Sequence, residues 1–150
     1  MRLEKVLFTI AVAATACGVA AGVGSASTPP RSGVLHVTKE CSKYNFKAGS
    51  FCTITTSGIP QIKVGSRVVY ASAPNFVSGV LDSDLVIDGP GSNTAFGHVV
   101  LNLGTLSGIV TFSGGTGEFS HFSAGPLAVA CPAFPSCSWD GPYSFDPPGH

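Results

Sequence analysis

Glycine and proline punctuate this chain so often that little of it can form long helices. Nineteen glycines and eleven prolines occur among 150 residues, and both residue types interrupt helices. Between them lie short runs rich in β-branched and aromatic residues, without the 3.6-residue period of an amphipathic helix. The runs lie at residues 34–38, 51–56, 68–71, 85–87, 98–103, 109–112, 119–122, 127–131 and 138–145. They predict an all-β domain of eight or nine short antiparallel strands, arranged as a sandwich or as a closed barrel.

The charge composition excludes one large class of functions. Charged residues make up 11% of the chain, less than half of the roughly 25% found in an average soluble domain. Eight basic residues balance eight acidic ones, with no block of like charge. The sequence therefore predicts no nucleic-acid partner. Because 44% of the residues are hydrophobic, the chain can bury a core, and its length fits a single domain.

The N-terminus has the three parts of a secretory signal peptide. Arg2 and Lys5 precede an uncharged apolar run at 6–24, and small residues follow it. We expect cleavage after Ala26, which predicts a secreted or extracytoplasmic protein with no integral membrane span in the mature chain. A transmembrane anchor fits less well, because much of the run is weakly hydrophobic Ala and Gly. Lipid anchoring at Cys17 is a minor alternative, since the residues before it loosely resemble a bacterial lipobox.

The four cysteines that remain after cleavage predict two disulfides. Cys41, Cys52, Cys131 and Cys137 form an even set in an exported chain, and four cysteines allow three connectivities. We favour local pairing, Cys41 with Cys52 and Cys131 with Cys137, because the cysteines fall as one pair near each end. Zinc binding competes poorly, since the chain has no CxxC motif and no His at ligand spacing from a Cys. We therefore predict no metal and no cofactor.

A cluster of three glycines marks a tight turn. Gly114, Gly115 and Gly117 lie between two β runs in the segment 111–119, where a positive φ or a close approach favours glycine. A phosphate-binding loop would need a GxGxxG or GxxxxGK pattern followed by a helix, and neither pattern is present. We therefore interpret these glycines as structural.

The same glycine turn resembles that of the allene oxide cyclase and dirigent superfamily. In those proteins a GGTGxF turn follows a strand that starts with Gly-His-Val, as residues 97–99 do here. Uncharacterised exported bacterial proteins of this type share three further strings, matched here by residues 64–71, 82–88 and 139–145. The resemblance covers residues 50–145 and implies an antiparallel, eight-stranded, calycin-like barrel whose interior can hold a small apolar ligand. It also implies that a homo-oligomer can form, but it transfers no catalytic residue to this chain.

With this resemblance the domain organisation can be stated. We expect a signal peptide at 1–26, a flexible lead-in at 27–33, a β-barrel domain at 34–146 and a tail at 147–150. Cleavage removes two basic residues and one acidic residue, which leaves a mature net charge of about −1.

Polar residues inside apolar strands are the candidates for ligand contact. Tyr70, Asp84 and His98 are predicted on this ground alone. Asp82, Asp84 and Asp88 share one strand face and oppose Leu85. These carboxylates are either pocket acids or, as we favour, solvated side chains, and a structural role for His98 is favoured over a catalytic one. The catalytic residues, if the protein has any, stay unassigned.

Three functions fit these observations. The first is an exported barrel that binds or orients a small apolar molecule, as ligand sites in barrel mouths do. The second is a non-catalytic extracellular structural or interaction protein whose barrel is filled by its own side chains. The third is an isomerase or cyclase, which rests on analogy of fold alone. A cavity of a few hundred Å³ would favour the first over the second.

Overall fold

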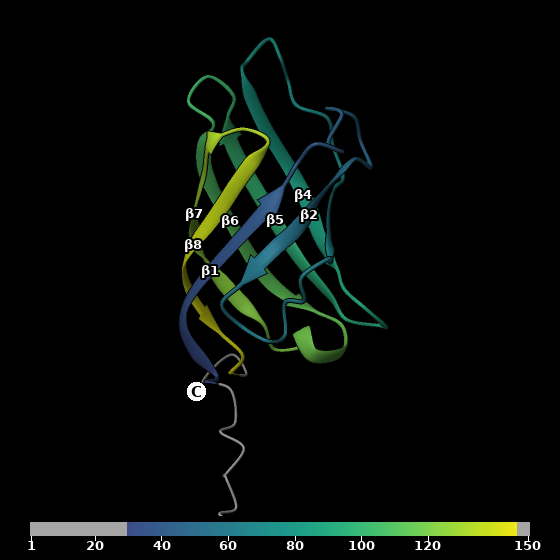
Figure 1. The fold of residues 1–150 in the computed structure, drawn as a ribbon, viewed down its shortest axis with the longest axis vertical. Coiled ribbons are helices and arrows are strands. Elements are labelled where there is room, and N and C mark those ends of the chain that lie inside the picture. The colour runs from purple at the N-terminus through teal and green to yellow at the C-terminus, as the bar shows by residue number, and fades with distance from the viewer. Residues whose placement is uncertain (1–29, 147–150) are drawn as a thin grey trace, which may run out of the picture.

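Eight antiparallel strands close into one barrel in the computed structural model, which describes residues 30–146 (Figure 1). Each strand pairs with the next one in the chain, and the first pairs with the last. The strands are β1 (Ser32–Glu40), β2 (Phe51–Ser57), β3 (Arg67–Tyr70), β4 (Val80–Asp88), β5 (Thr94–Asn102), β6 (Ser107–Gly115), β7 (Ser123–Ala133) and β8 (Ser136–Ser144). The expected all-β, eight-stranded antiparallel barrel is confirmed, and the sandwich alternative is excluded. The predictions for 1–26, Cys17 and 147–150 lie outside the described residues.

The two ends of the barrel differ in their loops. The connections β1–β2, β3–β4, β5–β6 and β7–β8 gather at one end, which we call the mouth, while β1 begins and β8 ends at the opposite end (Figure 1). β1 starts at Ser32, two residues before the domain boundary that the sequence predicts. Within residues 30–146, no helix has the length and apolar character needed to cross a membrane.

One predicted strand, 119–122, is wrong. The segment forms a short 3₁₀-helix, η1 (Gly117–Phe119), followed by a turn. Phe119 and Phe122 are both buried, and their ring centroids lie 5.3 Å apart. Phe122 also lies 4.9 Å from the ring of Phe145. The two apolar residues are three positions apart, which suits one face of a helical turn rather than one face of a strand. They close the barrel end opposite the mouth.

Alternation along the strands fills the barrel with side chains. In β4, Leu81, Ser83, Leu85 and Ile87 are buried, while the aspartates between them face solvent. Trp139 is fully buried in β8, and its ring lies 5.3 Å from that of Phe112. Burial of each large apolar side chain such as Leu81, Leu85 or Ile87 contributes about 1.5–3 kcal/mol. The middle of the barrel is therefore packed, as an eight-stranded barrel can be.

Two disulfides brace the mouth. Cys41 bonds Cys52, and Cys131 bonds Cys137. The local pairing predicted from the sequence is confirmed. The first bond ties the end of β1 to β2, and the second ties β7 to β8 across their hairpin. Disulfides of this kind suggest an oxidising, extracytoplasmic environment.

The glycine turn lies at the end opposite the mouth, from the last two residues of β6 to the first residue of η1. Gly114 and Gly117 have φ angles of +81° and +58°, in the left-handed region that favours glycine. At Gly115 there is no room for a side chain, because a Cβ there would lie 2.0 Å from the carbonyl oxygen of Thr94.

Replacing Gly115 by alanine therefore tests the packing of this turn. We expect Gly115→Ala to lower the free energy of unfolding by about 1–3 kcal/mol, the usual cost of overpacking. The matched control is Gly58→Ala, whose Cβ would meet its nearest neighbour, the His36 carbonyl oxygen, at 3.4 Å. Urea denaturation of both variants measures the difference. Equal stability of the two variants would contradict the packing argument.

Candidate functional site

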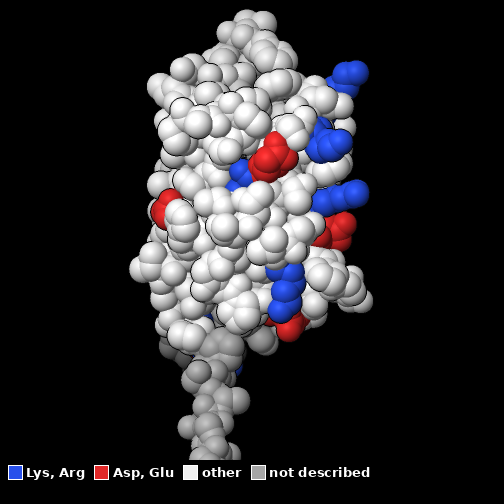
Figure 2. Space-filling model, viewed as in Figure 1, with Lys and Arg blue, Asp and Glu red and all other residues white. Residues whose placement is uncertain are grey.

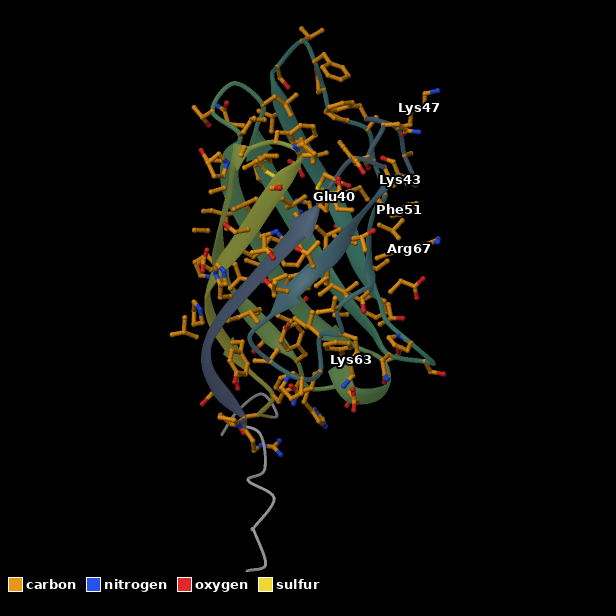
Figure 3. All side chains as sticks on the ribbon, in the orientation of Figure 1. Glu40, Lys43, Lys47, Phe51, Lys63 and Arg67 are labelled. Atoms are coloured by element: carbon orange, nitrogen blue, oxygen red, sulfur yellow. A yellow bond between two sulfur atoms is a disulfide. The ribbon has the colours of Figure 1, made fainter. Side chains whose placement is uncertain are left out.

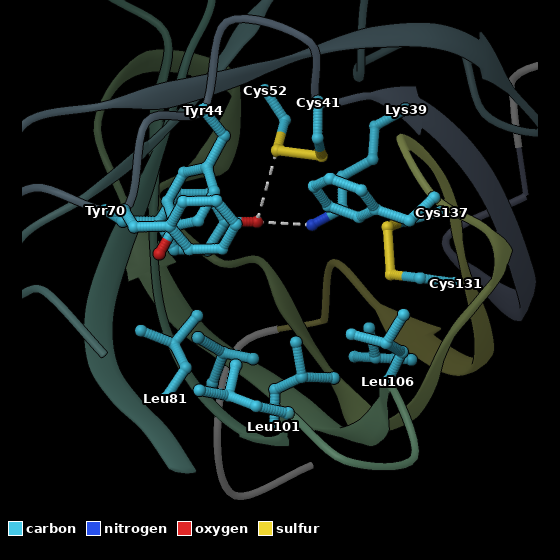
Figure 4. A pocket seen from close by; sticks show the side chains of 15 residues that line it. Lys39, Cys41, Tyr44, Cys52, Tyr70, Leu81, Leu101, Leu106, Cys131 and Cys137 are labelled. Carbon is cyan, nitrogen blue, oxygen red and sulfur yellow. Dashed lines mark hydrogen bonds between the residues drawn. A yellow bond between two sulfur atoms is a disulfide. The ribbon is translucent and has the colours of Figure 1, made fainter. Parts of the chain in front are cut away.

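A small cavity opens at the mouth of the barrel (Figure 4). Its volume is about 40 Å³, room for about three water molecules at 10–15 Å³ each on this measure. The side chains that line it are mostly apolar and come from seven strands and three mouth loops: Lys39, Cys41, Tyr44, Phe46, Cys52, Tyr70, Leu81, Val99, Leu101, Leu103, Leu106, Val129, Cys131, Phe134 and Cys137. Of these lining residues, none is Asp, Glu, Arg or His. The cavity therefore combines apolar walls with one amine and two phenols.

Lys39 places its amine inside this cavity. Every second residue of β1 points into the barrel, and these are Leu35, Val37 and Lys39. The Lys39 side chain therefore lies inside the barrel. Only 4% of Lys39 is exposed, and its Nζ donates a hydrogen bond to Tyr70 Oη. Nζ also lies 4.5 Å from the ring centroid of Trp139, within range of a cation–π contact. Burial lowers the pKa of Lys39 from its ordinary value of 10.5 to about 7.

Two tyrosines complete the polar part of the cavity. Tyr70, the last residue of β3, is buried, and its ring lies 5.1 Å from that of Tyr44. Burial raises the pKa of Tyr70, with a smaller contribution from Tyr44, so its hydroxyl stays protonated. Burial also raises the pKa of Tyr44. The Tyr44 hydroxyl is buried and has no hydrogen-bond partner, a condition that protein interiors rarely tolerate. It is free to bond a ligand or a water molecule.

The rim of the cavity is aromatic and partly exposed. Phe46 lies 6.0 Å from Phe76 and 6.3 Å from Phe134, measured between ring centroids. Between 40% and 68% of each of these three residues is exposed. Large apolar side chains gathered at one exposed end of a protein are typical of a binding surface.

Two residues that line the cavity have an unfavourable backbone conformation. Phe46 and Leu106 have φ angles of +62° and +53°, and within residues 30–146 they are the non-glycine residues with positive φ. Such a conformation is uncommon for bulky side chains and costs on the order of 1 kcal/mol. Both residues project their side chains onto the cavity. Strain of this kind gathers at ligand-binding sites.

The structure separates the three residues predicted from the sequence. Tyr70 lines the cavity, whereas Asp84 and His98 lie on the outer wall of the barrel, directly opposite each other on β4 and β5. His98 Nδ1 lies 2.8 Å from Asp84 Oδ1, and His98 Nε2 lies 2.7 Å from Asp82 Oδ1. The hydrogen bond to Asp84 is the largest cause that raises the pKa of His98. These residues form an exposed cross-strand cluster that does not reach the cavity.

Sequence reasoning missed Lys39 and Tyr44. The signal for Lys39 was its position in the alternation of β1, two residues after Val37 and four after Leu35. Tyr44 lies in a mouth loop, where no strand period applies, and only the fold brings its ring against Tyr70.

Apart from Lys39, no Lys, Arg, Asp or Glu among the described residues lines the cavity. Lys43, Lys47, Lys63 and Arg67 follow one side of the barrel, while most of the face in view is uncharged (Figures 2 and 3). Arg67 packs its guanidinium 4.5 Å from the ring centroid of Phe51, as an exposed cation–π pair. Among residues 30–146, no group of three or more His, Cys, Asp or Glu side chains is placed to hold a metal ion.

Comparisons of the chain with models of protein families, with curated proteins and with solved structures find no match.

The lowered pKa of Lys39 predicts a specific dependence of stability on pH. The unfolded chain binds a proton at this lysine up to about pH 10.4, whereas the folded chain releases it near pH 7. Stability therefore rises between pH 7 and pH 10, by at most about 1.4 kcal/mol per pH unit from this residue. Lys39→Met, which removes the amine, should flatten this rise. Denaturation of both proteins across this range measures it, and identical slopes would contradict the burial of the amine.

The outer-wall cluster gives a second prediction. Asp84→Asn should lower the pKa of His98 toward its ordinary value, because it replaces the carboxylate that accepts the main hydrogen bond from the charged ring with a neutral amide. The cluster stabilises the fold at low pH, and this contribution is lost as the pH rises through the raised pKa of His98. NMR titration of the His98 ring measures the change. Asp88→Asn, on the same face of β4, is the control and should leave the titration unaltered.

Proposed function

We propose that this protein is an exported barrel of the allene oxide cyclase and dirigent-like type that binds a small apolar molecule at its mouth. The observation that carries the proposal is the cavity itself, where apolar walls surround the Lys39–Tyr70 pair. A few polar groups in an apolar recess are what fix the orientation of a small ligand.

The size of the cavity decides how much of a ligand enters it. A volume of about 40 Å³ is well below the few hundred Å³ that would by itself favour a ligand site over a filled barrel. The proposal therefore rests on the polar groups in the cavity and on the strained residues that line it, not on cavity volume. One end of the ligand therefore occupies the cavity, and the rest lies against the aromatic rim formed by Phe46, Phe76 and Phe134. The packed middle of the barrel, centred on Trp139, takes no part.

The strained rim supports ligand binding over simple packing. A protein that used Phe46 and Leu106 only to fill space could reach the same stability without two left-handed backbone positions. Their strained conformation is accounted for if the side chains form the walls of a site. The buried Tyr44 hydroxyl adds a donor and acceptor without a present partner.

The chemistry of the resembled families is not part of the proposal. Allene oxide cyclases use a pocket carboxylate, and dirigent proteins use pocket acids and arginines. The described residues that line this cavity supply neither an acid nor an arginine. Binding is therefore favoured over an isomerase or cyclase activity.

An interaction protein with a filled barrel is the second candidate. Phe76 is 68% exposed and Val77 is fully exposed in the loop between β3 and β4, and the middle of the barrel is packed. If this alternative holds, the apolar rim contacts a macromolecule and the cavity stays empty of small ligands.

Leu106→Asn separates a binding role from a structural one. Asn adopts the left-handed conformation more readily than Leu, so the relieved strain offsets the lost packing of a partly buried side chain. We expect the free energy of unfolding to change by less than about 1 kcal/mol. The affinity for 1-octanol, a small apolar probe, should fall about tenfold, because binding of roughly 1.4 kcal/mol is lost with the apolar wall.

Isothermal titration calorimetry with 1-octanol measures this difference in affinity. Asp84→Asn, on the outer wall, is the matched control and should bind as the unaltered protein does. If 1-octanol binds neither the protein nor its variants, the ligand-binding proposal is overturned and the interaction protein is favoured. Equal binding by Leu106→Asn and the unaltered protein would place the site elsewhere.

A further inference from the structure

We propose that Lys39 forms an imine with an apolar aldehyde whose carbonyl group enters the mouth cavity. This inference rests on the proposed ligand site and names the class of ligand. It depends on three features of the cavity: a buried primary amine, a phenol bonded to it, and the absence of a counter-ion among the described lining residues.

The Lys39 amine reaches into the cavity and points toward Tyr70 Oη (Figure 4). Nζ lies between Tyr70 on one side and the disulfide Cys131–Cys137 on the other, and Leu101 and Leu106 face it across the open space (Figure 4). Nothing in this arrangement neutralises an ammonium ion. β4, β5, β7 and β8 contribute only apolar side chains and disulfide sulfurs, and the titratable groups that face Lys39 are Tyr44 and Tyr70.

A neutral amine in such a place is a nucleophile. At pH 7 about half of Lys39 is neutral, since its pKa is lowered to about 7. For a lysine in water, with a pKa of about 10.4, the neutral fraction is on the order of a thousandfold smaller. Desolvation in an apolar pocket is one of the general ways in which proteins activate lysine for reaction with carbonyl groups.

Tyr70 is placed to assist the reaction as a proton donor. Its hydroxyl accepts the hydrogen bond from Nζ, so its own proton is available to a carbonyl oxygen in the cavity. The Nζ lone pair attacks the carbonyl carbon, the carbonyl π electrons move to oxygen, and Tyr70 protonates that oxygen. A proton from Nζ returns to Tyr70, and the resulting carbinolamine loses one water molecule to give the imine. One aldehyde and one amine yield one imine and one water, without an oxidant or a reductant.

The rim accounts for the apolar part of the ligand. The cavity holds the carbonyl group and a few carbon atoms, and the remaining chain lies on Phe46 and Phe134, whose rings are 6.3 Å apart. The mouth is open at this rim, so the water that the reaction releases can leave.

Reductive trapping with octanal and cyanoborohydride at pH 7 tests the inference. We expect a single secondary-amine adduct by intact mass, and peptide mapping should place it on Lys39. Lys39→Met should lose the adduct. Lys43→Met, which removes an exposed lysine of the neighbouring loop, should retain it. 1-Octanol, which fits the same site but cannot form an imine, should compete with octanal.

Two measurements test whether Tyr70 and the lowered pKa of Lys39 promote imine formation, or whether the amine reacts only because the aldehyde binds beside it. Tyr70→Phe should slow imine formation at least tenfold at an octanal concentration that saturates the site, where a change in octanal affinity does not alter the rate. The trapping rate at constant octanal should rise as the pH passes through 7 and then level off. A rate that rises only near pH 10 would overturn the inference.

The outcomes test imine formation at Lys39 separately from the binding of a small apolar molecule at the mouth. Adducts spread evenly over the exposed lysines, or an adduct that persists in Lys39→Met, would overturn imine formation at Lys39. If 1-octanol still binds in that case, the ligand site itself stands. Peptide mapping of the unaltered protein decides the question even if a variant fails to fold.

Discussion

The pairing of β1 with β8 is the constraint on which the rest of the structure depends. It closes the barrel through nine successive residue pairs, from Ser32 opposite Ser144 to Glu40 opposite Ser136. The same register sets Val37 opposite Trp139 and Lys39 opposite Cys137, so it places both the centre of the core and the amine of the cavity. Because side chains alternate between the two faces of a strand, a shift by one residue would turn Lys39 outward and expose Val37.

The two ends of the barrel are stabilised in different ways, by disulfides at the mouth and by packed phenylalanines at the opposite end. The disulfides hold the ends of four strands there, while the opposite end is closed by Phe119, Phe122 and Phe145. An amine without a counter-ion would destabilise a fully closed core. Its hydrogen bond to Tyr70 and its contact with Trp139 offset part of that cost. The lowered pKa of Lys39 reduces the rest of the cost, because the neutral amine has no charge to desolvate.

The sequence predicts a residue's position where the residue lies in a strand with regular alternation of side chains, and it does not where the residue lies in a loop or a turn. The alternation of β4 predicted that Asp82 and Asp84 share one face and Leu85 takes the other, and the structure agrees. The segment 119–122 was misassigned because two phenylalanines near a glycine turn look like a strand until their spacing of three is weighed. Lys39 was overlooked because the predicted strand at 34–38 ended one residue before it, whereas β1 continues to Glu40 and the alternation of Leu35 and Val37 places Lys39 inward. The contact between Tyr44 and Tyr70 joins a loop to a strand, and no regular spacing in the sequence predicts such a contact.

The central claim is that a small apolar molecule binds at the mouth with Lys39 beneath it. Intermolecular NOEs between 1-octanol and methyl-labelled protein test this claim most directly. We predict NOEs to the methyl groups of Val99, Leu106 and Val129, which line the cavity. NOEs confined to exposed outer residues such as Val34 and Ile109, or none at all, would contradict it.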